Sequence, residues 1–464
     1  MSGIFGICSQ NDEANVAEMV YFALFALQHR GQESCGIAVC DKGHINNYRR
    51  DLGLVPEVFT TEALEKLGFG NMAIGHVHYG TSSQYKNRSL AQPLVVRHIN
   101  GPMAIALSGS LTNAAELREQ LELSGAIFHS MGDAEVVANL ITRARIKTDS
   151  IESAVKEAIK SLKGAYSLIV MSPRKMIAAR DPYGFRPLCL GRHKGDYIIS
   201  SESCAIDCLG ADFVREIEAG EVVVIEENNL RSVQKGSSKP TGLCLFEFIY
   251  FARQDSIIED VSVHEVRRKS GEFLAKEHPI DADIVIGVPE SGLDAAIGYA
   301  QATGIPYGLG FTKNRYVGRT FIQPSISARE RAVDIKLNAI ADTVKNRRVI
   351  MIDDSIIRGT TTGKIVKLIR AAGAKEVHVR ISAPPFIYPC YFGTDVASQE
   401  NLIASKMSCN EICEHIGADS LAFLSAGNAE KIALKSGCGF CAGCFTGVYP
   451  TGETLNTGGQ EVLL

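Results

Sequence analysis

The chain has 464 residues, of which 45% are apolar and 22% charged, and its formal net charge at pH 7 is −4. This length predicts two or three domains that each bury a core, and the small net charge argues against nucleic acid or an acidic membrane surface as a partner. No apolar run approaches the ~20 residues that span a bilayer. The first residues show no secretory signal, so we expect a cytoplasmic protein.

The first half of the chain is predicted to form strands and helices in alternation. Residues 1–7, Met-Ser-Gly-Ile-Phe-Gly-Ile, alternate small and apolar side chains, which is typical of a strand. Further strands are predicted at residues 165–171 and 197–200, and a helix is predicted over residues 153–163. These elements indicate a sandwich of sheets covered by helices.

Between these elements lie stretches rich in glycine and polar residues. They are Leu-Gln-His-Arg-Gly-Gln-Glu-Ser-Cys-Gly-Ile (27–37), Gly-His-Val-His-Tyr-Gly-Thr (75–81), Ser-Gly-Ser-Leu-Thr-Asn (108–113), Gly-Asp-Ala-Glu (132–135) and Arg-Asp-Pro-Tyr-Gly-Phe-Arg-Pro-Leu (180–188). A polar segment rich in turn formers follows at residues 233–242, and we place a domain boundary there. The predicted domains are residues 1–235 and 243–450.

The second half begins with a predicted strand and turn. Residues 283–288 are apolar enough for a buried strand, and the turn Pro-Glu-Ser-Gly-Leu-Asp (289–294) and a helix through residue 302 follow. Backbone N–H groups of such a turn can hold a diphosphate, although an ordinary strand-to-helix turn is the preferred interpretation when it stands alone. The charge-rich segments at residues 313–321 and 329–338 lack clear periodicity, which is typical of a solvated loop.

The strongest functional signal lies in residues 349–362, Val-Ile-Met-Ile-Asp-Asp-Ser-Ile-Ile-Arg-Gly-Thr-Thr-Thr. Its first four residues predict a short buried strand of a parallel sheet, and Asp353 and Asp354 follow where that strand ends. Ligands of open α/β sheets bind beyond the carboxyl ends of the strands. The two carboxylates can therefore face ribose hydroxyls and a hard cation such as Mg²⁺. A buried strand that ends in an acidic turn is the simpler alternative.

The residues after the acidic pair have the composition of a phosphate-binding loop. Gly359 lets the backbone turn tightly. Thr360 and Thr361, with the start of a helix predicted over residues 363–372, offer O–H and N–H donors to a phosphate. Because the acidic pair, the glycine and the threonines follow one strand in one order, we favour the functional interpretation.

This order resembles the 5-phosphoribosyl-1-pyrophosphate (PRPP) signature of the phosphoribosyltransferases. The stretches in the first half resemble the N-terminal-nucleophile glutaminase domain of the glutamine amidotransferases. Together they make the chain similar to the amidophosphoribosyltransferases over roughly residues 2–450. The resemblance implies an α+β glutaminase-like domain, an αββα sandwich, followed by an α/β type I phosphoribosyltransferase domain. It also implies formation of 5-phosphoribosylamine for purine synthesis, Mg²⁺ as cofactor, a homotetramer and inhibition by purine nucleotides.

The resemblance also assigns residues to PRPP. It implies that Asp353 and Asp354 are catalytic and hold Mg²⁺ with Ser291, and that the charge-rich segment is a lid that closes over PRPP and excludes water. The residues that it predicts to bind PRPP are Glu290, Ser291, Lys313, Tyr316, Arg319, Asp353, Asp354, Arg358, Gly359, Thr360 and Thr361.

The glutamine pocket differs from the family at three positions. Ser2 stands where the family has its nucleophilic cysteine, and a hydroxyl is the poorer nucleophile. His78 replaces the arginine that pairs with the glutamine carboxylate, and an imidazole cannot form that bidentate fork. Ser108 replaces an oxyanion-hole asparagine, a loss that typically costs about 10²–10³ in rate. The pocket residues that match the family are Thr81, Gly109 and Asp133. We therefore expect weak or absent glutaminase activity.

Thirteen cysteines are many for a cytosolic chain and indicate a metal site or catalysis. The pair Cys441-Ala-Gly-Cys444 alone is compatible with a zinc half-site or a redox pair. With Cys244 and Cys390 it matches, residue by residue, the four ligands of the [4Fe–4S] cluster in the iron–sulfur branch of the family. Five further cysteines are expected to be buried thiols, namely Cys189, Cys204, Cys208, Cys409 and Cys413.

The resulting expectation is an amidophosphoribosyltransferase that converts PRPP with ammonia, and with Ser2 as nucleophile if glutamine is still hydrolysed. A regulatory paralogue that binds PRPP or nucleotides is the alternative from another class. A transferase that uses another amine donor is a third possibility.

Overall fold

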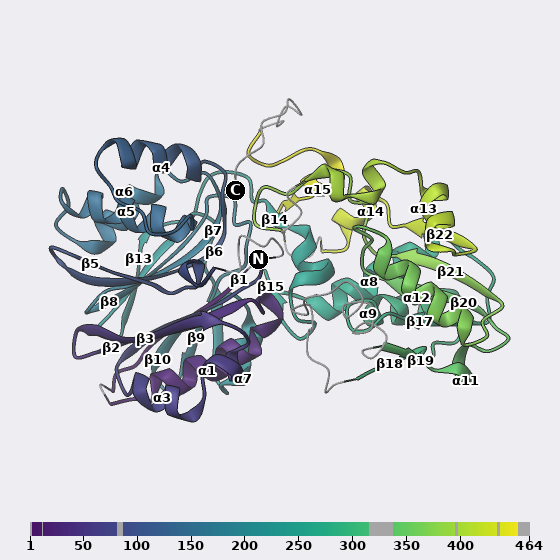
Figure 1. The fold of residues 1–464 in the computed structure, drawn as a ribbon, viewed down its shortest axis with the longest axis horizontal. Helices are drawn as coiled ribbons and strands as arrows, with labels where there is room; N and C mark the ends of the chain where they lie inside the picture. Colours follow the sequence, from purple (N-terminus) through teal and green to yellow (C-terminus); the bar gives the residue numbers. More distant parts are fainter. Residues whose placement is uncertain are drawn as a thin grey trace.

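The computed structural model describes residues 2–11, 13–80, 87–314, 337–394, 398–433 and 437–452 (Figure 1). The first half contains two antiparallel sheets. One has the strand order β11-β9-β10-β1-β4-β2-β3 and the other β13-β12-β8-β7-β6-β5. The strands of the first sheet are β1 (Ser2–Cys8), β2 (Ser34–Asp41), β3 (His44–Leu52), β4 (Met72–His78), β9 (Cys189–His193), β10 (Asp196–Ser200) and β11 (Asp212–Glu216). Those of the second are β5 (Leu94–His98), β6 (Gly101–Leu111), β7 (Gly164–Met171), β8 (Lys175–Arg180), β12 (Val222–Glu226) and β13 (Asn229–Gln234).

The two sheets face each other and helices cover both outer faces. Ile4 of β1 and Ile74 of β4 pack with Ile169 of β7 in the core between the sheets. Phe5 of β1 points the other way, into the core under the helices, because successive side chains of a strand alternate between faces. Helices α1 (Val16–Ala26), α2 (Val55–Val58), α3 (Thr61–Leu67) and α7 (Ser203–Cys208) lie on one side, and α4 (Ala114–Leu123), α5 (Asp133–Arg145) and α6 (Ile151–Ile159) on the other. The predicted αββα sandwich is confirmed.

The second half is built on a parallel sheet in the order β17-β20-β21-β22. Its strands are β17 (Ile284–Gly287), β20 (Arg348–Asp353), β21 (Glu376–Ile381) and β22 (Ser420–Phe423), and its helices are α8 (Val263–Glu277), α9 (Leu293–Thr303), α11 (Ala341–Val344), α12 (Thr360–Ala371), α13 (Cys409–Ile416) and α14 (Ala426–Lys431). Every residue of β17 is buried, as expected for a parallel strand covered on both faces. The predicted α/β fold of the second half is confirmed.

The second half also contains three two-stranded sheets. They are β14 (Leu243–Cys244) with β23 (Phe440–Cys441), β15 (Ile257–Ile258) with β16 (Val261–Ser262), and β18 (Phe311–Lys313) with β19 (Leu337–Ala339). Figure 1 shows the sandwich on the left and the α/β half on the right, with β14, β15 and the start of β1 between them. The predicted domain boundaries at residues 235 and 243 stay a prediction. In the part of the chain that the structure describes, no helix is long and apolar enough to cross a membrane.

Candidate functional site

The carboxyl ends of β17 and β20 bring Ser291 and the acidic pair together. Gly287 is paired with Ile352, so the loop after β17 and the residues after β20 leave the sheet side by side. The Ser291 hydroxyl donates a hydrogen bond to Oδ2 of Asp354. A side chain on Gly292 would put its Cβ 2.5 Å from the Ile352 carbonyl oxygen, so only glycine permits this approach.

Both aspartates lie in surroundings that disfavour their charge. Asp353 ends β20 and accepts the Asp354 backbone N–H at 2.9 Å, and both residues are 7% exposed. Burial, followed by the neighbouring Asp354 carboxylate, raises the pKa of Asp353 well above its usual value. Burial also raises the pKa of Asp354, while hydrogen bonds from Ser291 and Ser355 partly offset that effect. The two buried carboxylates and the Ser291 hydroxyl lie together and offer oxygen ligands, which suit a hard cation such as Mg²⁺.

The helix that follows the acidic pair begins earlier than the sequence predicts. Helix α12 starts at Thr360, not at residue 363, because Gly359 has φ +76° and serves as the residue before the first helical turn. A Cβ at Gly359 would lie 2.8 Å from the Ile403 side chain. Thr360 and Thr361 are therefore in the first turn of the helix, and with Arg358 they are exposed to solvent. The free N–H groups of a first helical turn attract anions.

The predicted lid residues are described only in part. Lys313 ends β18, and its Nζ lies 3.0 Å from Oε1 of the exposed Glu290. This ion pair brings the predicted lid next to the predicted diphosphate turn. Tyr316 and Arg319, with the rest of residues 315–336, lie outside the described residues, so their predicted contacts stay predictions.

In the first half, the register between β1 and β4 places Ser2 opposite His78. The Ser2 hydroxyl oxygen lies 2.9 Å from Nδ1 of His78. The carbonyl oxygen of Ser2 accepts two hydrogen bonds, from the Ser108 hydroxyl at 2.8 Å and from Nε of Arg30 at 3.0 Å. Burial lowers the pKa of His78 well below its usual value, and the positive charge of the N-terminal amino group and then His76 lower it further, so its imidazole is neutral at neutral pH. Two of the three altered positions therefore contact the third.

The other pocket residues lie on neighbouring segments of the same half. Asp133 starts α5, accepts the Leu111 backbone N–H at 2.8 Å, and has its pKa raised by burial to about 6. Gly109 has φ +126°, and a Cβ there would lie 2.1 Å from the Ala165 carbonyl oxygen. Thr81 lies outside the described residues.

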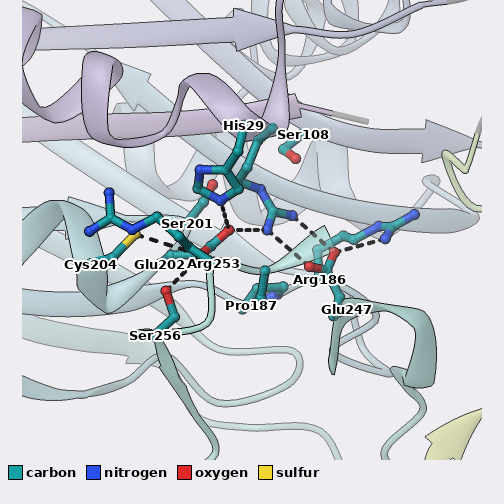
Figure 2. Close-up of polar contacts among 12 residues, drawn as sticks. His29, Ser108, Arg186, Pro187, Ser201, Glu202, Cys204, Glu247, Arg253 and Ser256 are labelled. Carbon is teal, nitrogen blue, oxygen red and sulfur yellow. Dashed lines mark hydrogen bonds and ion pairs between the residues drawn. The ribbon is translucent and has the colours of Figure 1, made fainter. Parts of the chain in front are cut away.

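A buried ion network next to Ser2 was not predicted from the sequence (Figure 2). The Arg30 guanidinium, fully buried, donates to Oε1 of Glu202 at 2.5 Å and to both carboxylate oxygens of Glu247 at 2.9 Å. Glu247 also accepts from Arg186 at 2.8 Å. Burial opposes the charge of Glu247, but Arg30 and then Arg186 lower its pKa below the usual value. The network thus joins the Ser2 carbonyl to the second half of the chain.

Glu202 is the other carboxylate of this network. Among the described residues, it forms with His29 and Cys204 the group whose three possible metal-ligand atoms lie within 4.8 Å of one another. Glu202 already accepts from His29 at 2.8 Å, from the Ser256 hydroxyl at 2.6 Å and from the Arg253 backbone N–H at 2.9 Å. With Arg30 bound as well, its lone pairs are used, and the group is an ion-pair network and not an open metal site.

The four predicted cluster ligands converge at the junction of the two halves. Cys244 and Cys441 are opposite each other in the parallel pair of β14 and β23. Cys444 lies in α15 (Gly443–Thr446), and its carbonyl oxygen accepts the N–H groups of residues 387 and 388, just before Cys390. Burial raises the pKa of Cys244 to about 11, and the Arg186 guanidinium opposes that shift. All four sulfurs are free thiols.

The remaining cysteines differ in their exposure to solvent. The expectation that the remaining cysteines are buried is wrong for Cys208 and Cys409, which are exposed, and for Cys413, which is half-buried.

The first half is an αββα sandwich with Ser2 at the start of its first strand, and the second half is a parallel sheet with an acidic pair and a Gly-Thr turn after one strand. These features together define a class of enzyme. It joins a glutamine amidotransferase domain to a phosphoribosyltransferase domain. Residues 82–208 match the family described as glutamine amidotransferase domain. The amidophosphoribosyltransferases of Methanocaldococcus jannaschii and Bacillus subtilis are each 46% identical to this chain, over 97% of it and over 98% and 94% of their own lengths.

Solved structures agree with these relatives. The glutamine PRPP amidotransferase from B. subtilis complexed with ADP and GMP matches with a TM-score of 0.89 and 45% identity over 98% of both chains. A structure described as the allosteric regulatory enzyme of purine biosynthesis has the same TM-score and identity and covers 97% of this chain and 96% of its own. The chain therefore belongs to the amidophosphoribosyltransferases, pentosyl-transferring enzymes of purine biosynthesis.

Proposed function

We propose that this chain forms 5-phosphoribosylamine from PRPP with ammonia as the nitrogen donor and with little use of glutamine. The contact of Ser2 with His78 carries this proposal. At 2.9 Å, the imidazole that replaces the family's carboxylate-binding arginine is turned to the nucleophile position. The Ser108 hydroxyl, which replaces an oxyanion donor, is likewise turned to the Ser2 carbonyl.

The transferase half supports the proposal because its acidic pair, diphosphate turn and phosphate loop lie at one end of the sheet. Asp353 and Asp354 are proposed to bind the ribose hydroxyls and, with Ser291, Mg²⁺. Arg358, Gly359, Thr360 and Thr361 are proposed to hold the 5-phosphate, and Glu290, Lys313, Tyr316 and Arg319 to contact the diphosphate or form the lid. Ammonia is itself a nucleophile, so these residues act by positioning PRPP and stabilising charge.

We propose that Cys244, Cys390, Cys441 and Cys444 hold a [4Fe–4S] cluster. The pairing of Cys244 with Cys441 and the hydrogen bonds from residues 387 and 388, just before Cys390, to the Cys444 carbonyl support it. The Arg186 guanidinium also supports it, because its pKa is raised by Cys244, Glu247 and Cys390 against the effect of burial. A positive charge beside four thiolates offsets part of their negative charge. The cluster would tie the C-terminal segment to the sheet core and supply no step of the transfer.

Partners and location are proposed from the relatives. The B. subtilis structure holds ADP and GMP, and we propose that purine nucleotides also inhibit this chain. A homotetramer and a cytoplasmic location are proposed on the same basis.

The donor preference predicts a measurable difference between ammonia and glutamine. Anaerobically purified protein with PRPP and Mg²⁺ should form phosphoribosylamine with ammonia, and at least about 10²-fold more slowly with glutamine, because an oxyanion donor and the carboxylate fork are changed. The triple variant S2C/H78R/S108N, with Met1 removed, should gain glutamine-dependent product and keep its rate with ammonia. Equal rates with both donors in the unaltered chain would refute the proposal, and no product with either donor would favour a regulatory paralogue.

The ligand set of the cluster predicts the outcome of single cysteine replacements. Replacing Cys444 or Cys390 with serine should remove most iron and acid-labile sulfide from protein reconstituted without oxygen, because a hydroxyl is a poor ligand for iron–sulfur clusters. The matched control is Cys438→Ser, which lies close in sequence but outside the proposed set and should keep the iron. Elemental analysis distinguishes the outcomes: stoichiometric zinc with no sulfide in the unaltered protein would exclude the cluster.

A further inference from the structure

The altered glutamine pocket brings the Ser2 hydroxyl and the His78 imidazole into contact, which the separate substitutions do not suggest. Ser2 and His78 come from adjacent antiparallel strands, and their hydroxyl and Nδ1 atoms are within hydrogen-bond distance. Ser2 is 3% exposed, so water does not compete strongly for its hydroxyl. A serine hydroxyl next to a neutral imidazole is the arrangement that activates serine nucleophiles. The burial that keeps His78 neutral also makes it a weaker base, so the pair is expected to react slowly.

We propose that Ser2 and His78 form a nucleophile and general-base pair that cleaves neutral acyl compounds, carboxamides or esters, and that this pair needs no free amino group on Ser2. In the tautomer with its proton on Nε2, His78 accepts the Ser2 proton through Nδ1. The base of this site is then a side chain of β4. An α-amino group released by processing is not required for that role.

The surroundings hold both members in place. The Ser2 carbonyl oxygen is fixed by the Ser108 hydroxyl and by Nε of Arg30. His78 lies on the strand between β1 and β2, where it is paired with Ser2 on one side and Ser34 on the other. Its ring stacks on the His76 ring at 5.8 Å between centroids. A nucleophile and base on paired strands keep their geometry better than groups on loops.

The charges nearby indicate the class of substrate. Arg30, which is bonded to the Ser2 carbonyl, is committed to Glu202 and Glu247 and cannot turn to a substrate carboxylate. An acyl compound that carries no carboxylate does not need a cationic side chain to bind it. Neutral amides and esters are therefore favoured over glutamine, whose carboxylate requires a cationic partner.

The chemistry balances with water as the only co-reactant. The Ser2 proton passes to Nδ1 of His78 while Oγ forms a bond to the acyl carbon, and the imidazolium then gives that proton to the leaving amine or alcohol as its bond breaks. The imidazole next takes a proton from water, whose oxygen attacks the acyl-serine. The acid is released, and the proton returns to the Ser2 hydroxyl.

The test uses a neutral fluorophosphonate, a reagent selective for activated serines, on the full-length protein. Peptide mass mapping should place the adduct on Ser2, and replacement of His78 by Gln or Asn should slow labelling by about 10²–10⁴-fold, the usual contribution of a general base. Ser34→Ala is the matched control, because Ser34 faces His78 from the other strand, and it should label within a few-fold of the unaltered protein. Mapping also shows whether the labelled chains retain Met1.

The outcomes separate this inference from the proposed function. All variants are also assayed for phosphoribosylamine formation with ammonia, which reports folding and does not use Ser2. Active transferase without an adduct at Ser2, or with labelling indifferent to His78, would overturn the inference and leave the proposed function intact. Labelling confined to chains that have lost Met1 would overturn the claim that no free amine is needed.

Discussion

Replacing Asp354 with asparagine should lower the rate of PRPP amination with ammonia by about 10³-fold. Metal-assisted charge stabilisation is worth several kcal/mol, and about 1.4 kcal/mol corresponds to a factor of ten. The variant loses a carboxylate that accepts the Ser291 hydroxyl hydrogen bond at the proposed metal site. Asp353→Asn should have an effect of similar size, since both side chains lie at the same strand end.

The same site predicts that activity and stability change in opposite directions. Burial and the Asp354 charge raise the folded-state pKa of Asp353 above its unfolded value. Such a carboxyl favours the folded state when protonated, so its contribution is present below about pH 4 and is lost as the pH rises through the folded-state pKa. Asp353→Asn removes this penalty and should raise the thermal unfolding midpoint at pH 7 while it abolishes most activity.

Two measurements check this pair of effects. The first is the steady-state rate with ammonia, and the second is thermal unfolding with and without Mg²⁺ and PRPP. These ligands should stabilise the unaltered protein more than the variant. Asp281→Asn is the control, because Asp281 is 86% exposed and binds Arg348 at the opposite end of the sheet. A variant at Asp353 that keeps more than a tenth of the activity would contradict the proposed role.

The transferase site was predictable because its signal is local. Four apolar residues, two aspartates and a glycine within eleven positions define a strand end and the loop after it. The predicted start of the helix was wrong because the threonines of its first turn have low helix propensity, and the positive φ of Gly359, which allows the earlier start, is not visible in the sequence.

For the site in the sandwich half, the sequence identified the residues but could not predict which of them contact one another. Ser2 and His78 are 76 residues apart, and their hydrogen bond depends on the β1–β4 register, which no local pattern specifies. Arg30 lies 172 residues from Glu202 and 217 from Glu247. The available signal was a charged residue inside an apolar run, as for Glu247 in Leu-Phe-Glu-Phe, because a charge there needs a buried partner.

Replacing Glu247 with glutamine should destabilise both halves of the molecule at once. Glu247 accepts from Arg30 of the sandwich half and from Arg186, whose other guanidinium nitrogen donates to the Phe392 carbonyl at 2.8 Å. Removing one partner of a buried ion pair typically costs about 3–5 kcal/mol, because the remaining charges stay buried without compensation. Glutamine would remove the Glu247 charge that pairs with the fully buried Arg186 guanidinium, and it would leave Arg30 with Glu202 as its carboxylate partner.

The expected result is a lower unfolding midpoint, with faster hydrogen exchange in β1 and in residues 440–446 together. Glu272→Gln is the control, because its pair with Arg268 lies on the surface of α8 and is worth at most about 1 kcal/mol. Because Arg30 and Arg186 hold the pKa of Glu247 down against burial, the stabilisation is present above the unfolded-state pKa and is lost as the pH falls through the folded-state value. The difference between the unaltered protein and the variant should therefore shrink in acid. Exchange that increases in one half alone would mean that the network does not couple the nucleophile position to the cysteine site.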